Sequence, residues 1–67
     1  MLYKKGLYEK AIAELKWALL LEEKYINNPI YEAAIRNPLG LAYEAMGYYN
    51  LAEMEFEKAN RLRKDVP

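Results

Sequence analysis

The sequence repeats a pattern of small and apolar residues at a fixed offset of 41 positions, and this repeat limits the possible folds more than any other feature. A period between about 20 and 50 residues is typical of repeat architectures. Each copy has a glycine, then a tyrosine, and then alanine and larger apolar residues at helical spacing. This order predicts a tight turn followed by a helix that a neighbour can approach closely. The paired residues are Gly6 and Gly47, Tyr8 and Tyr49, Ala11 and Ala52, Leu15 and Phe56, Ala18 and Ala59, and Leu21 and Leu62.

Composition restricts the chain to one small domain with a high apolar content. At 67 residues a single core is marginal, and the absence of Cys and His removes disulfides and zinc sites as reinforcement. Hydrophobic residues make up 54% of the chain and charged residues 30%, which excludes a disordered tail. This mixture favours densely packed helices.

Charge and hydropathy exclude two classes of partner. Ten basic and ten acidic residues cancel, so no net field attracts nucleic acid or an anionic membrane. No apolar run approaches the roughly 20 residues that span a bilayer. Residues 1–6 lack the apolar stretch and cleavage site of a signal peptide, so the cytoplasm is the default expectation, although the sequence leaves the compartment open.

Helical periodicity and helix-ending residues predict three helices and no strand. The first helix is expected at about residues 7–25, the second at about residues 30–46, and the third at about residues 49–63. Asn28 is suited to cap the second helix, with Pro29 as its first residue, and Gly47 supplies the turn before the third.

Two finer expectations concern the second and third helices. Pro38 lies inside the second helix, where it removes a backbone donor, so we expect a kink there or a break with Asn37 capping a new helix. The third helix is expected to pack antiparallel on the second, because the turn at Gly47 is short. Its inward stripe is Tyr49, Ala52, Phe56, Ala59 and Leu62.

The second half of the chain resembles the tetratricopeptide repeat signature in its order and spacing, through Leu39, Gly40, Tyr43, Gly47, Tyr49, Ala52, Phe56 and Ala59. In that family a repeat of about 34 residues forms two antiparallel helices. The resemblance implies an all-α fold in which residues 33–66 form a complete repeat. Residues 1–26 resemble mostly the second helix of a preceding repeat, with Gly6 at its turn, and residues 27–32 form an inserted linker or turn.

The chain departs from the family pattern in its period of 41 residues and in Pro38, which stands where the family has a good helix former. The segment Asn28-Pro29-Ile30-Tyr31 also resembles bacterial pilus-assembly and outer-membrane lipoprotein members of the family. In the family, the first helix of each repeat lines a groove that binds partners. By this resemblance the candidate groove residues are Tyr3, Lys4, Ala34, Asn37, Pro38, Leu41, Glu44 and Ala45.

A second apolar patch lies on the first expected helix, on the side opposite its main apolar face. Ala13, Trp17 and Leu20 form this patch, and Leu51 and Met54 continue it by analogy on the third helix. Isolated exposed apolar residues are normal on any protein surface. A tryptophan with aliphatic neighbours is instead a candidate contact for self-association.

Catalytic and metal-binding constellations are missing from the sequence. The chain has no His, Cys, Ser or Thr, so the usual general base, thiol and hydroxyl nucleophiles are absent, and we expect no enzyme activity and no cofactor. Glu53, Glu55 and Glu57 alternate along a helix and point in different directions, so they do not converge on one metal ion.

The sequence therefore predicts a non-enzymatic scaffold that binds a protein or peptide partner on a helical-repeat surface. The alternative is a structural self-association unit, such as a homodimer with exchanged helices, or a fragment of a longer repeat array. As an isolated chain it is expected to form a homo-oligomer, because repeat units depend on neighbours to cover their apolar faces.

Overall fold

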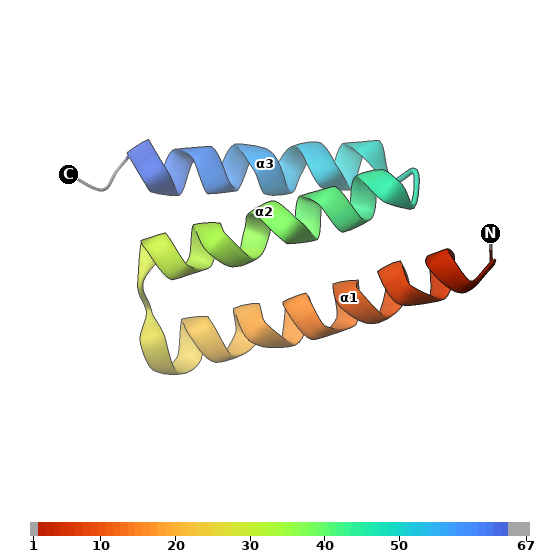
Figure 1. Cartoon of the computed structure of the whole chain (residues 1–67). Coiled ribbons are helices and arrows are strands. Elements are labelled where there is room, and N and C mark those ends of the chain that lie inside the picture. The colour runs from red at the N-terminus through yellow and green to blue at the C-terminus, as the bar shows by residue number, and fades with distance from the viewer. Residues whose placement is uncertain (1, 65–67) are drawn as a thin grey trace.

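In the computed structural model, the described residues are 2–64, with side chains described from Lys5 to Lys64. They form three long helices, α1 (Leu2–Leu21), α2 (Pro29–Ala45) and α3 (Tyr49–Lys64), and a π-helical turn, η1 (Glu22–Ile26), follows α1 (Figure 1). Residues 2–64 contain no strand. The predicted all-α fold with three helices is confirmed.

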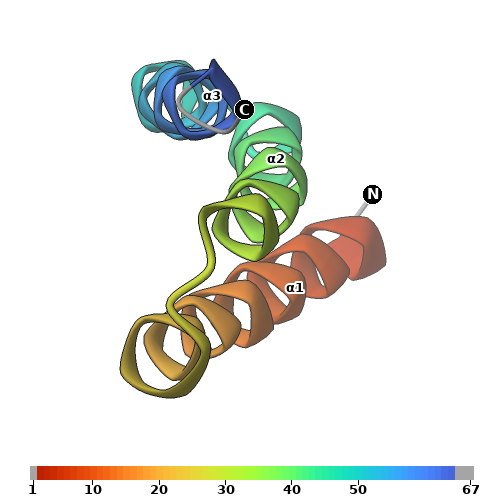
Figure 2. The ribbon, with the colours of Figure 1, turned by 90° about the vertical axis from the view of Figure 1, so that its left-hand side faces the viewer.

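The three helices form an open, bent layer with α2 in the middle. Successive helices run antiparallel, and Figure 2 shows α1 and α3 on different flanks of α2. No Cα atom of α1 comes within 8 Å of one in α3. The molecule measures 42 × 22 × 13 Å, as a bent layer of three helices should. Each outer helix therefore packs against α2 along one flank only.

The core is centred on α2, and all three helices contribute to it. Leu39 and Tyr43 of α2 and Ala52 of α3 are buried together. Half-buried apolar residues surround them, and these are Ile12, Leu15, Leu19 and Phe56. Because so few large side chains are fully enclosed, much of the apolar content of the chain stays at the surface.

The pair α2 and α3 packs closely, in the antiparallel arrangement that the sequence predicted. A Cβ atom added at Gly40 would lie 2.6 Å from Cε1 of Phe56, so glycine lets the aromatic ring sit directly against the α2 backbone. Ala52 is 2% exposed and Ala59 0% exposed. Small residues on both helices therefore allow the close approach that the repeated alanines indicated.

The start of α1 corrects the sequence prediction. The helix begins at Leu2 rather than near residue 7, and Gly6 lies inside it rather than at a turn. The segment before Gly6 contains no helix-ending residue, and a single internal glycine destabilises a helix by only about 1 kcal/mol relative to alanine. The end also differs, because regular α-helix stops at Leu21 and residues 22–26 form the π-helical turn.

The connection between α1 and α2 is short and held by hydrogen bonds. Asn27 adopts a left-handed conformation with φ of 58°, and its N–H donates to the Glu22 carbonyl at 2.6 Å. Asn28 caps α2 as predicted, because its side-chain oxygen accepts from the Ile30 N–H at 2.9 Å, and Pro29 is the first helical residue. Of residues 27–32, which were expected as a linker or turn, only Asn27 and Asn28 lie outside the helices.

Three other expectations about α2 and α3 are resolved by the structure. Helix α2 continues through Pro38, so Asn37 does not cap a new helix. Gly47 has φ of 84°, in the region that favours glycine, and forms the predicted turn. Tyr49 was wrongly placed on the inward stripe of α3, since it is 67% exposed. Tyr48 packs against Tyr43 instead, with ring centroids 6.3 Å apart.

Candidate functional site

An apolar groove runs between α1 and α2, at the edge of the core. Its volume is about 370 Å³, and it is open to solvent along its length. All the residues that line it are apolar or aromatic, so the groove offers contact area rather than reactive groups. They are Tyr8, Ala11 and Leu15 from α1, and Pro38, Leu41, Ala42 and Ala45 from α2.

The α2 wall follows from helical spacing. Pro38, Leu41 and Ala45 lie three and four residues apart, so their side chains share one face of the helix. All three are exposed, and Leu41 is 58% exposed, whereas Ala42 is buried beside them. Pro38 has no backbone N–H, so the Ala34 carbonyl lacks its usual helical donor. The wall is therefore apolar.

The α1 wall is built in the same way. Tyr8, Ala11 and Leu15 are separated by three and four residues and share one face of α1. Ala11 and Leu15 are half-buried, and Tyr8 is 37% exposed. Leu15 contributes both to the edge of the core and to the groove. A helix or extended peptide that enters the groove would therefore contact residues already fixed by packing.

The structure brings together only part of the predicted groove set. Leu41 and Ala45 line the groove, together with Pro38. Ala34 and Glu44 are exposed on α2, and Asn37 is half-buried, but none of these three lines the groove. Tyr3 and Lys4 were also predicted, and their side chains lie outside the described part of the structure.

The sequence analysis missed the α1 wall of the groove. The resemblance assigned groove residues to the first helix of each repeat, so Tyr8, Ala11 and Leu15, which belong to the second helix of the partial repeat, were not among them. Their helical spacing was visible in the sequence, but spacing alone does not show which part of this face α2 leaves uncovered. The sequence does not show that these residues share a groove with Leu41, because this depends on how α1 lies beside α2.

The second predicted surface, the Trp17 patch, is solvent-exposed. Its members are Ala13, Trp17 and Leu20, and Trp17 is 61% and Leu20 54% exposed. Leu20 also borders a shallow hollow beside Glu23 and Lys24. Leu51 and Met54 on α3 are exposed as well. They do not extend the patch directly, because α1 and α3 lie on different flanks of α2.

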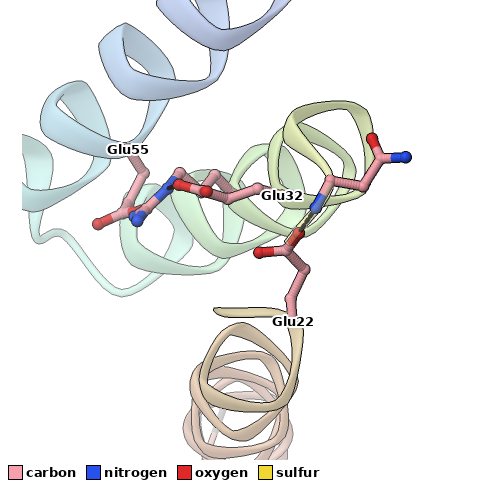
Figure 3. Close-up of polar contacts among 5 residues, drawn as sticks. Glu22, Glu32 and Glu55 are labelled. Carbon is pink, nitrogen blue, oxygen red and sulfur yellow. Dashed lines mark hydrogen bonds and ion pairs between the residues drawn. The ribbon is translucent and has the colours of Figure 1, made fainter. Parts of the chain in front are cut away.

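The main polar contact is a structural ion-pair cluster, which joins α2 to α3 (Figure 3). Arg36 Nε donates to Glu32 Oε2 at 2.8 Å, and Arg36 Nη1 donates to Glu55 Oε1 at 2.7 Å. Burial lowers the pKa of Arg36, but the hydrogen bonds and charges of the two glutamates outweigh this effect, so its pKa is raised. Glu53 and Glu57 are exposed on α3, while Glu55 points at Arg36.

Glu22, the first residue of η1, is a second polar feature and is buried. It is 1% exposed, and its Oε1 accepts from the Asn28 N–H at 2.5 Å (Figure 3). Its Oε2 has no hydrogen-bond partner among the described residues. Because Oε1 holds the backbone of the capping residue, Glu22 fixes the connection between α1 and α2.

Comparisons with known proteins give no further information about the site. No model of a known protein family matches the sequence, and searches of curated proteins and of solved structures returned no match. Among the described residues, none of the helices combines the length and the apolar character that crossing a bilayer requires.

Proposed function

We propose that this chain is a non-enzymatic protein-binding module of the tetratricopeptide-repeat type, which receives a partner helix or peptide in the groove between α1 and α2. The observation that carries the proposal is the open apolar groove itself, with Leu41 at its rim 58% exposed. Exposed apolar surface of this kind marks interaction sites in small proteins. Grooves between helices commonly bind amphipathic helices through apolar residues at helical spacing.

The composition of the groove supports a protein partner rather than a small reactive substrate. Its lining offers no carboxylate, amine or imidazole. The chain as a whole has no His, Cys, Ser or Thr to act as a general base or nucleophile. Contact with a partner would remove apolar surface from water, at about 25 cal/mol per Å² buried.

The repeat-family part of the proposal is supported by the contact between α2 and α3. Gly40 lies against Phe56, Ala52 and Ala59 are buried, and Gly47 forms the turn, as the signature requires of these positions. The first, partial repeat lacks the expected turn, because Gly6 lies inside α1. The repeat-family part of the proposal therefore rests on residues 33–64 rather than on α1.

Site-specific photo-crosslinking in cells that express the chain tests the proposal. A photoreactive phenylalanine analogue replaces Leu41 in the groove or, as the control, Leu51, an exposed leucine on α3 outside it. We expect a protein adduct from position 41 that is absent from position 51 and is lost when Ala45→Arg is added. Identical adducts from both positions, or none from position 41, would refute binding in the groove.

Self-association through the Trp17 patch is a second candidate function, favoured by the exposure of Trp17 and Leu20. Light scattering over a concentration series, combined with Trp17 emission, tests it directly. A dimer whose emission shifts to the red on dilution supports this function. A monomer at high concentration with water-exposed Trp17 rules it out.

A further inference from the structure

The two outer helices carry the same repeated pattern, but only one of them has its alanine face covered. The offset of 41 residues pairs Ala11 with Ala52 and Ala18 with Ala59. On α3 the two alanines are 2% and 0% exposed, because α2 lies against them. On α1 both alanines are only half-buried, and Ala11 opens into the groove. The repeat therefore predicts that a helix packs on the alanine face of α1, and no helix among the described residues covers this face as α2 covers that of α3.

The contact on α3 shows what kind of helix such a face accepts. Helix α2 meets α3 through Leu39 and Tyr43, which share the core with Ala52. It also brings Gly40 against Phe56 and pairs Arg36 with Glu55 at 2.7 Å. In sequence these four α2 residues read Arg-x-x-Leu-Gly-x-x-Tyr.

The residues that receive this pattern on α3 have equivalents on α1. At the same offset, Glu14 corresponds to Glu55 and Leu15 to Phe56. Glu14 is exposed, and no ion pair joins it to another residue within the described part of the chain. Helix α2 packs on the neighbouring side of α1, through Ile12, Leu19 and part of Leu15, which also lines the groove. Ala11 and Leu15 in the groove, with the exposed Glu14 and the half-buried Ala18 beside it on α1, therefore form a helix-binding face that α2 covers only in part.

We propose that the groove binds an amphipathic helix with the pattern Arg-x-x-Leu-Gly-x-x-Tyr on one face. Its arginine pairs with Glu14, its glycine lies against Leu15, and its leucine and tyrosine cover the side of Ala11. Leu41 and Ala45 on the other wall contact the flank of the same helix. This inference rests on the proposed function and names the class of partner that the groove accepts.

An intact second copy of the chain cannot supply this helix. The matching face of its own α2 is already occupied, since Leu39 is 1% exposed and Gly40 is buried against Phe56. Exchange would require α2 to leave α3 and break the ion pair between Arg36 and Glu55. The occupant is therefore a helix of a different polypeptide segment, rather than the partner in a simple homodimer.

A peptide with the sequence of residues 28–46 is a direct probe, because it carries the pattern with its own N-cap. It is titrated into the isotopically labelled full chain, and amide resonances are followed by NMR. We expect saturable shifts at Ala11, Glu14 and Ala18. A peptide with Gly40→Leu should bind at least about tenfold more weakly, since the added side chain prevents close approach, although its helix propensity is higher.

Charge reversal makes the test specific for the ion pair. The chain variant Glu14→Arg with the native peptide, and the native chain with the peptide Arg36→Glu, should each bind up to about fivefold more weakly. Combining the two variants should restore the affinity. Because Glu14 is exposed, the chain variant should keep the circular dichroism and melting of the native protein.

Three outcomes would overturn the inference. These are no saturable binding, equal binding of the native and Gly40→Leu peptides, or shifts confined to α3, which would mean that the peptide replaced the α2 of the chain. If the peptide fails but position 41 still crosslinks to a partner, only the choice of partner helix is wrong. If position 41 yields no adduct, the proposed function itself fails.

Discussion

Ala59 lies fully buried between α3 and α2, so enlarging it tests how closely these helices pack. It is 0% exposed, and leucine adds three carbon atoms where no space remains. Overpacking of this kind destabilises proteins by about 1–3 kcal/mol. A chain of 67 residues has a total stability of about 3–10 kcal/mol. Ala59→Leu should therefore lower the melting temperature by about 5–20 °C.

The repeat provides a matched control for this substitution. Ala18 occupies the equivalent position in α1, but it is only half-buried because no helix covers its flank. Ala18→Leu should change stability by no more than about 0.5 kcal/mol, as at a site with room for the side chain. Thermal and urea unfolding followed by circular dichroism measure both variants. Equal destabilisation would refute the reasoning, because it would mean that the two alanine faces are covered alike.

Three further substitutions test local features of α2 by the same unfolding measurements. Gly40→Ala should destabilise by about 1–3 kcal/mol, because the new Cβ would lie 2.6 Å from the Phe56 ring, and an unchanged melting temperature would contradict that contact. Asn28→Ala should lose about 1 kcal/mol, since its side chain caps α2, and stability equal to the native chain would mean that the cap contributes nothing. Pro38→Ala should raise the melting temperature, because α2 continues through this position and an internal proline disfavours a helix by about 3 kcal/mol; a decrease would show that Pro38 supports the helix.

The helices of the second half could be predicted because their boundaries depend on local chemistry. Asn28 and Pro29 start α2, and Gly47 at φ of 84° separates it from α3. The antiparallel contact followed from the short turn and the repeated alanines. These features need no knowledge of distant residues.

The start of α1 and the α1 wall of the groove could not be predicted from the local sequence. Gly6 was assigned to a turn by resemblance, but without a second helix-ending residue the helix continues through it. The groove needs Tyr8 and Leu41 to face each other, which depends on how α1 lies beside α2. Only the three-dimensional structure separates a covered helix face from an open one.

The affinity of the chain for the partner captured through position 41 tests the central claim most directly. Leu41→Glu places a charge in the apolar groove, and Leu51→Glu places one on an exposed leucine of α3 outside it. Calorimetric titration should show at least about a tenfold loss of affinity for Leu41→Glu, with its melting temperature unchanged, and native affinity for Leu51→Glu. Equal affinities for the two variants would contradict binding in the groove between α1 and α2.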